Sequence, residues 1–379
     1  TIEHCKCPQK QTAQQRQRMP NVLIAGGGSG GHVAPAIAVA EALVAQGSTC
    51  TLATSHRAID ACMLTSTTFE SFALPAAPLK LSVQGGIRFL RGFAQTEQIV
   101  RTYIEEAGID CVVSTGGFVC APALRAARKA HCPTVMLNLD DPPGKANRLA
   151  SRWADCILTT VDCTLPNAER IPPPVRSSVL ATARQNETYT AYGLDPQKLL
   201  LLVTGASQGA TSINACIPEL AMQNPTFFQG WQVVHLTGTG NDEEVSAKWG
   251  ETDVQYCVLE FEEQMGTLWG ITDLAITRGG ANTIAELAIN AVPAVVLPYP
   301  YHKDDHQRTN AEQLRKVGGV LVEKDYINTT KNLAHAGNTI LALLKDHQKR
   351  FAMRQALASQ TPINGSTCVA DACMRISTA

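Results

Sequence analysis

The stretch NVLIAGGGSGGHVAPAIAVA, residues 21–40, decides the fold of this chain. It joins a short apolar run to a series of glycines, and the apolar segment 34–45 that follows has the length of a helix. A strand, a glycine turn and a helix in this order open a doubly wound α/β domain. Glycine lets the backbone approach a ligand closely, and the start of the helix directs free N–H groups toward an anion.

The same order of strand, turn and helix recurs along the rest of the chain. Short apolar runs that alternate with helical segments predict parallel sheets with helices on both faces. The run Pro172-Pro173-Pro174 fits neither a helix nor a central strand, so we expect an interdomain linker there and a cleft between two α/β halves. The expected strands are 21–25, 48–53, 110–114, 133–137 and 155–159 in the first half, and 199–203, 231–236, 254–259, 273–277, 294–297 and 319–322 in the second.

Composition narrows the class of protein. The 379 residues are 45% hydrophobic and 17% charged, as in a globular protein of two domains. A formal net charge of −1 argues against a general nucleic-acid binder. The 13 cysteines contain no C-x-x-C pair, which favours free thiols over disulfides or a metal site.

No segment of the sequence predicts a membrane span or a signal peptide. The apolar runs are shorter than the roughly 20 residues that cross a bilayer. Residues 1–20 are mostly polar and lack the apolar centre of a signal sequence, so we expect a disordered N-terminal extension. A cytosolic protein, or one bound peripherally to the cytosolic side of a membrane, is expected.

The first glycine loop resembles a dinucleotide-binding turn but lacks its partner. Gly26, Gly28 and Gly31 match the pattern G-x-G-x-x-G. A dinucleotide site also uses an acidic residue at the end of the second strand to hold a ribose. That strand ends here in ATSH, residues 53–56, without an acid. The loop is therefore expected to face a ligand other than NAD.

Three further loops follow strands in the second half. The loop 204–210, TGASQGA, could hold a diphosphate with its amides and Ser207, and it lacks the G-K-[ST] ending of an ATP-binding P-loop. Glu286 follows two glycines into a helix, where its carboxylate could accept two ribose hydroxyls. An exposed helix glutamate is the alternative. The polar segment 298–310 follows an apolar strand, at the edge where α/β sheets bind ligands.

Four segments taken together resemble the MurG family of glycosyltransferases. Its members transfer N-acetylglucosamine from UDP-N-acetylglucosamine to lipid I, a lipid-linked muramoyl-pentapeptide, and so form lipid II in peptidoglycan synthesis on the cytoplasmic side of the cell membrane. The matching segments are GGGSGGHVAPAIAVA (26–40), STGGFVCAP (114–122), GASQGATSIN (205–214) and RGGANTIAELA through HKDDHQRTNA (278–311).

The resemblance implies the two-domain GT-B fold, an α/β architecture with two doubly wound, Rossmann-like domains. Residues 21–172 would form the acceptor and membrane-side domain, and 173–355 the UDP-sugar domain. Residues 356–379 would contain a last helix, at 366–376, that returns to the first domain. The resemblance implies neither a cofactor nor a metal, and no nucleic-acid partner.

The resemblance also implies roles for individual residues. Glu286 would hold the uridine ribose, Arg176 and Ser207 would contact the diphosphate, and Gln208 would be a further substrate-binding residue. Ala281, Gln307 and Asn310 would lie at the donor sugar. Ser29, Gly30 and His32 would face the acceptor and the reacting carbon, with Gly117 in a loop that receives the acceptor's diphosphate.

His32 is the candidate general base of an inverting displacement. A neutral imidazole at the mouth of the first loop could take the proton of the attacking hydroxyl. The alternative is that His32 orients the loop or binds the acceptor phosphate.

Several positions depart from the family pattern. Asn138-Leu139-Asp140-Asp141 replaces His-Glu-Gln-Asn, and Pro172-Pro173-Pro174 precedes Val-Arg in place of Gly-Asn-Pro. His306-Gln307 replaces paired glutamines, and Gly279-Gly280-Ala281 replaces Ser-Gly-Ala. A GT-B transferase with another lipid or small-molecule acceptor therefore stays open, as does a UDP-sugar epimerase of the same fold.

One segment of the first half has the composition of a membrane-docking surface. An apolar patch with interleaved cations suits an anionic lipid surface. A helix packed into the core, with a few exposed cations, is the alternative. The apolar residues are Leu79, Leu81, Ile87, Phe89, Leu90 and Phe93, and the cations are Lys80, Arg88 and Arg91.

Overall fold

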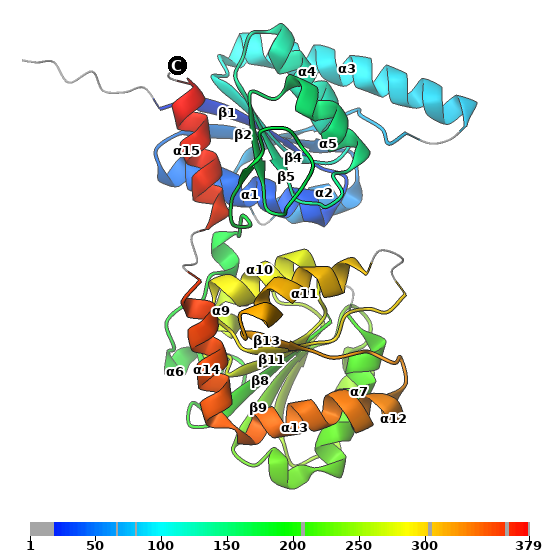
Figure 1. The fold of residues 1–379 in the computed structure, drawn as a ribbon, viewed down its shortest axis with the longest axis vertical. Helices are drawn as coiled ribbons and strands as arrows, with labels where there is room; N and C mark the ends of the chain where they lie inside the picture. The colour runs from blue at the N-terminus through cyan, green and yellow to red at the C-terminus, as the bar shows by residue number, and fades with distance from the viewer. Residues whose placement is uncertain are drawn as a thin grey trace, which may run out of the picture.

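A computed structural model describes residues 19–65, 67–79, 82–205, 209–301, 305–360 and 364–377. They form two α/β domains stacked along the long axis of the molecule (Figure 1). Each domain is built on one parallel sheet, with strand orders β3-β2-β1-β4-β5-β6-β7 and β10-β9-β8-β11-β12-β13. The expected GT-B architecture of two doubly wound domains is confirmed.

The N-terminal sheet places the first glycine loop at its centre. β1 pairs with β2 on one side and with β4 on the other, so the winding of the chain reverses beside β1. Ligands of open α/β sheets bind at such a reversal, beyond the carboxyl ends of the strands. The strands are β1 (Asn21–Gly26), β2 (Thr49–Ser55), β3 (Glu70–Leu74), β4 (Cys111–Gly116), β5 (Thr134–Asn138), β6 (Cys156–Thr159) and β7 (Glu169–Arg170).

Helices cover both faces of this sheet. The helices α1 (Gly30–Ala45) and α15 (Gly365–Ser377) pack on one face, and α3 (Val83–Ala107) and α4 (Cys120–Lys129) pack on the other. Two short helices, α2 (Ala58–Leu64) and α5 (Lys145–Ala150), complete the domain. Since α1 begins at Gly30 rather than at residue 34, His32 lies in the first turn of the helix and not in the loop.

The C-terminal sheet is covered in the same way. Apolar residues of α7, α8 and α13 pack on one face, and those of α9, α10 and α11 on the other. The strands are β8 (Leu199–Thr204), β9 (Trp231–Leu236), β10 (Gln255–Leu259), β11 (Leu274–Thr277), β12 (Ala294–Val296) and β13 (Val320–Val322). The helices are α6 (Asn186–Ala191), α7 (Thr211–Gln223), α8 (Asp242–Gly250), α9 (Met265–Ile271), α10 (Ala281–Ile289), α11 (His306–Lys316), α12 (Thr329–Asn332), α13 (Asn338–Lys345) and α14 (His347–Ala358). Short turns of helix are η1 (Ser151–Trp153), η2 (Ser177–Val179), η3 (Pro225–Phe227) and η4 (Leu333–Gly337).

The chain crosses between the domains twice, and the two crossings lie side by side. The first runs from β7 through the prolines to η2, and the second joins α14 to α15 (Figure 1). The Asn364 amide accepts a hydrogen bond from the Val175 N–H (2.9 Å) and donates one to the Val175 carbonyl (2.5 Å). A Cβ on Gly365 would lie 1.7 Å from the Pro172 carbonyl oxygen, so this contact requires glycine.

Candidate active site

Two glycine loops of the N-terminal domain pack against each other where β1 and β4 end. Gly116 and Gly117 have φ values of 118° and 85°, which favour glycine. A Cβ on Gly116 would lie 2.2 Å from His32 Nδ1, and one on Gly117 would lie 1.9 Å from the Gly27 carbonyl oxygen. The second loop is therefore shaped to hold the His32 ring and the first loop in direct contact.

The tautomer of His32 follows from its hydrogen bond. His32 Nδ1 lies 3.3 Å from the Thr115 carbonyl oxygen, which can only accept, so Nδ1 carries the proton. The lone pair is then on Nε2. Burial lowers the pKa of His32 below 6.5, against the opposing effect of the Asp140 and Asp60 carboxylates. The ring is therefore neutral at neutral pH, with an unprotonated Nε2.

Asp60, which no sequence motif marked, is a buried carboxylate that holds the first loop. Its Oδ2 accepts hydrogen bonds from Gly28 N (2.7 Å), Ser55 N (3.0 Å) and Ser55 Oγ (2.6 Å). Asp60 comes from α2, five positions after Ser55, and not from the end of β2 where an acid was sought. It supports the loop from beneath, and no local sequence pattern marks this role.

Arg57 links the two N-terminal loops from the exposed side. Its Nη1 donates to the Gly28 carbonyl at 2.6 Å, and its guanidinium lies 5.3 Å from the centre of the Phe118 ring. Ser29 is exposed at the N-cap of α1, and Gly30 is half-buried next to it. The structure thus brings Ser29, Gly30, His32 and Gly117 together around one pair of loops.

Glu286 is half-buried on α10, and burial raises its pKa to about 7. The Trp269 indole N–H donates to Glu286 Oε2 at 2.9 Å. Together with the nearby positive charge of Arg176, this hydrogen bond opposes the rise in pKa. Glu286 is therefore not the exposed helix glutamate of the alternative interpretation. Its carboxylate lies close enough to Arg176 for that positive charge to lower its pKa.

Gln307 and Asn310 use their side chains to hold neighbouring loops. Gln307 Oε1 accepts from the Tyr299 N–H at 2.8 Å, and Asn310 Nδ2 donates to the Gly279 carbonyl at 3.0 Å. A Cβ on Gly279 would lie 2.1 Å from the Gln307 carbonyl oxygen. Ala281 is exposed as the first residue of α10. These residues surround the glycine turn that precedes Glu286.

A second missed group lies beneath the loops of the C-terminal domain. Arg278 donates to Asp325 Oδ2 (2.5 Å), to Ser212 Oγ (2.8 Å) and to the Leu297 carbonyl (2.8 Å). Ser212 also donates to Asp325, which is almost completely buried. This group joins the turn that begins at Arg278 to Ser212 at the start of α7, and removing Asp325 would leave the buried Arg278 charge uncompensated.

Two expected donor-site residues, Ser207 and Gln208, lie outside the described residues. The same holds for Lys80 and Leu81 before α3, for most of the N-terminal extension, and for residues 302–304. The glycines on either side of the diphosphate loop are described. A Cβ on Gly209 would lie 1.9 Å from the Thr237 carbonyl oxygen, and Gly209 has a φ of 70°. The loop therefore ends in close contact with the turn after β9.

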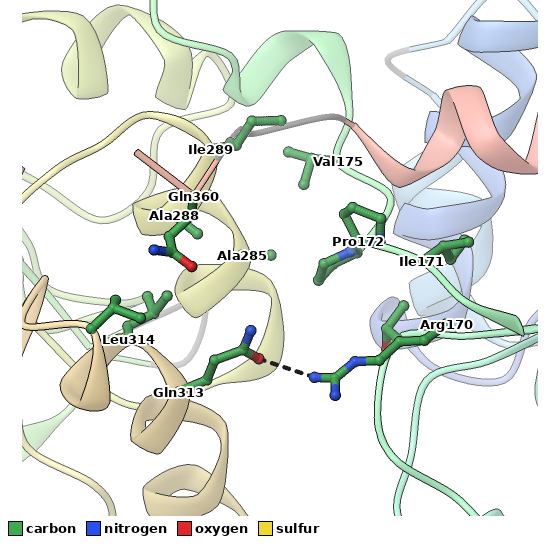
Figure 2. A pocket seen from close by; sticks show the side chains of 13 residues that line it. Arg170, Ile171, Pro172, Val175, Ala285, Ala288, Ile289, Gln313, Leu314 and Gln360 are labelled. Atoms are coloured by element: carbon green, nitrogen blue, oxygen red, sulfur yellow. Dashed lines mark hydrogen bonds between the residues drawn. The ribbon is translucent and has the colours of Figure 1, made fainter. Parts of the chain in front are cut away.

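A cavity of about 330 Å³ separates the domains beside the crossings (Figure 2). Arg170 Nη2 from the N-terminal domain donates to Gln313 Oε1 from α11 across it, at 3.2 Å. Its lining includes Val175 and Ala285, the chain neighbours of Arg176 and Glu286. In the part of the chain that the structure describes, no cluster of three His, Cys, Asp or Glu side chains is arranged to hold a metal ion.

Comparison with known proteins identifies relatives over nearly the whole chain. The model of the glycosyltransferase family 28 N-terminal domain matches residues 22–159, and that of the C-terminal domain matches residues 200–364. A relative from Clavibacter michiganensis is 32% identical over 359 residues, which cover 92% of this chain and 94% of the relative. One from Streptomyces coelicolor is 32% identical over 353 residues, or 89% and 93% of the two chains.

Both relatives carry the name UDP-N-acetylglucosamine–N-acetylmuramyl-(pentapeptide) pyrophosphoryl-undecaprenol N-acetylglucosamine transferase. The crystal structure of MurG from Acinetobacter baumannii superimposes with a TM-score of 0.72, covering 94% of this chain and 99% of that one. Its sequence is 23% identical, so this match bears on the fold. The resemblance noted in the sequence is confirmed: the chain belongs to the MurG family, within glycosyltransferase family 28.

Proposed function

We propose that this protein is an inverting hexosyltransferase that moves N-acetylglucosamine from UDP-N-acetylglucosamine to the lipid-linked muramoyl-pentapeptide, forming lipid II. The names of relatives that match nine-tenths of the chain carry this proposal. Two residues agree with it: the neutral His32 in the N-terminal domain, and in the C-terminal domain Glu286, whose carboxylate could accept the hydroxyls of a ribose. The domain at residues 21–172 would receive the acceptor, and that at 173–355 the donor.

The proposed reaction is a single displacement. The acceptor hydroxyl attacks the anomeric carbon, its proton passes to Nε2 of His32, and UDP leaves with the bonding electron pair. Negative charge grows on the departing diphosphate. The positive charge of Arg176, which lies near Glu286, would stabilise this charge. So would the N-terminus of α7, the helix that follows the loop 205–209. Ser207, Gln208, Ala281, Gln307 and Asn310 would complete the donor site.

An assay with both substrates tests this function. Purified protein should release UDP from UDP-N-acetylglucosamine when a lipid I analogue is present, with release falling to background when the analogue is omitted. Conversion of the donor to its epimer without acceptor would instead identify an epimerase. Release with a different lipid acceptor, and none with the lipid I analogue, would contradict the proposed acceptor.

We further propose that the protein binds the cytoplasmic membrane surface through α3. Val83, Ile87 and Leu90 on this helix, together with Leu79 just before it, expose 83%, 47%, 67% and 59% of their surface. These four residues and the exposed Arg88 and Arg91 are called the α3 patch. The exposure of these side chains supports docking at this end of α3. Phe93, by contrast, packs against the core, and the buried residues of the helix run from Gly92 to Ile104. Among the described residues, no helix is both long and apolar enough to cross a membrane.

Changing Arg88 and Arg91 to glutamine should weaken binding to anionic vesicles roughly thirtyfold, since each cation near such a surface contributes about 1 kcal/mol. Binding to zwitterionic vesicles should change little. Vesicle sedimentation measures both. Ile99→Ser, at an exposed position further along α3, is the matched control. Equal binding of the double variant and the wild type to anionic vesicles would refute the role of the patch.

A further inference from the structure

A chain of three buried polar side chains lies in the C-terminal domain, away from the residues given roles above. Trp249 on α8, His235 on β9 and Asn214 on α7 expose 0%, 0% and 5% of their surface. The Trp249 indole nitrogen lies 3.0 Å from His235 Nδ1, and His235 Nε2 lies 3.1 Å from Asn214 Oδ1. Asn214 Nδ2 in turn lies 2.9 Å from the Thr237 carbonyl oxygen. These groups form the Trp249–His235–Asn214 chain.

The direction of every hydrogen bond in this chain follows from its first member. An indole N–H can only donate, so His235 Nδ1 accepts and its proton must be on Nε2. That Nε2–H donates to Asn214 Oδ1, which leaves the Asn214 amide nitrogen to donate to Thr237. Burial lowers the pKa of His235 to about 3, so the ring stays neutral near neutral pH. Protonation of His235 therefore does not reverse the direction of these hydrogen bonds near neutral pH.

The Trp249–His235–Asn214 chain ends at the turn after β9, where this turn contacts the end of the loop 205–209. The Thr237 carbonyl that accepts from Asn214 lies against Gly209, the glycine that ends the loop. Asn214 itself belongs to the first turn of α7, where its N–H donates to the Ala210 carbonyl at 2.8 Å. Asn214 thus holds the start of α7 through its backbone N–H and the turn after β9 through its side chain. Asn241 Nδ2 lies 3.4 Å from the same Thr237 carbonyl oxygen, and it also donates to the Gly238 and Thr239 carbonyls, at 3.2 and 3.1 Å.

We propose that His235 is a positioning residue for the donor diphosphate, acting through Asn214 on Gly209 and on the start of α7. The inference rests on the proposed function, since it takes a UDP-sugar as the ligand of that loop. Groups that are already held in their binding position lose less entropy when a ligand binds. The position of Thr237 bears on Gly209, because a Cβ on that glycine would lie 1.9 Å from the Thr237 carbonyl oxygen.

Two substitutions at His235 separate positioning from packing. Leucine has a similar bulk but leaves Asn214 Oδ1 and the Trp249 N–H without partners. Glutamine again offers one acceptor and one donor. His235→Leu should raise the Kd for UDP and the KM for the donor about tenfold, as expected when buried polar partners are left unpaired. At saturating donor, kcat should stay within about threefold of wild type, and His235→Gln should recover most of the affinity.

The matched control is Val233→Ala, which removes core volume from the same strand without touching the polar chain. It should lower the Tm and leave the Kd for UDP unchanged. Equal Kd values for His235→Leu and the wild type, measured by calorimetry, would overturn the proposal. An equal loss of affinity in Val233→Ala would also overturn it, because general destabilisation would then explain the effect.

A spectroscopic measurement on the wild type does not depend on how the variants fold. Nitrogen-15 NMR of labelled histidine should show His235 protonated on Nε2 alone from pH 5 to 8, with the Nε2–H signal shifting when UDP is added. Protonation on Nδ1 would overturn the proposed direction. If the wild type binds no UDP, the proposed function fails and the positioning role with it, whereas tight binding with an unaltered Kd in His235→Leu removes the positioning role alone.

Discussion

Replacing His32 by alanine should lower kcat roughly 10²- to 10⁴-fold, the range by which a positioned general base accelerates a reaction. The reason lies in the tautomer. The Thr115 carbonyl holds the proton on Nδ1, so the unprotonated lone pair is on Nε2. A discontinuous or steady-state assay of UDP release, with both substrates saturating, measures kcat. The KM values should change far less than kcat.

Two variants control this experiment. His32→Gln can still donate to the Thr115 carbonyl but supplies no base, so it should be as impaired as the alanine variant. His56→Ala changes an exposed histidine at the end of β2 and should be close to wild type. Because burial lowers the pKa of His32, the wild-type rate should fall on an acidic limb below pH 6.5. A near-normal kcat for His32→Ala would leave only the orienting role.

Replacing Glu286 by alanine should weaken binding of UDP-N-acetylglucosamine roughly 10²- to 10⁴-fold. A carboxylate that accepts two ribose hydroxyls makes two charge-assisted hydrogen bonds, each worth about 1.5–3 kcal/mol. Calorimetric titration of the donor measures the loss. Glu243→Ala, at an exposed position on α8, should bind the donor as the wild type does. An unchanged Kd in Glu286→Ala would place the ribose elsewhere.

The pH dependence of donor binding tests the same carboxylate. Burial raises the pKa of free Glu286 to about 7, and ribose hydroxyls donate to its ionised form. Binding below that pH must therefore release a proton, so affinity should rise from pH 5 to 7 and level off above it. UDP-N-acetylglucosamine is the ligand to use, because the terminal phosphate of UDP itself titrates near pH 6. Glu286→Gln should bind more weakly at pH 8 and show no such dependence.

The strands that sequence patterning predicted are apolar runs; most are buried on both faces, and the largely half-buried edge strands β10 and β13 were predicted as well. Each is a continuous apolar run, as parallel strands between two helix layers require. The two strands that were missed, β3 and β7, lie at the edges of the N-terminal sheet. Only Leu74 of β3 is buried, and both residues of β7 are exposed, so neither produces an apolar run.

The candidate site divides in a similar way. Glycine turns are visible in the sequence because their backbone demands a particular residue, and they led to His32 and Glu286. Asp60, Asp325 and His235 support those turns through side-chain contacts that no spacing rule describes. Asp325, for example, meets Arg278 from 47 positions away. Such partners become visible only when the fold brings distant segments together.

The second crossing of the chain has a consequence for biosynthesis. The apolar face formed by Val113 and Leu137 in the N-terminal sheet is covered by α15, whose residues leave the ribosome after the entire C-terminal domain. Domains made first generally fold first during synthesis. Here α1 covers one part of that face at once, and the part beneath Val369 and Ala370 stays uncovered until α15 has been made. A polypeptide that stops before residue 365 would leave this apolar part of its first domain exposed to solvent.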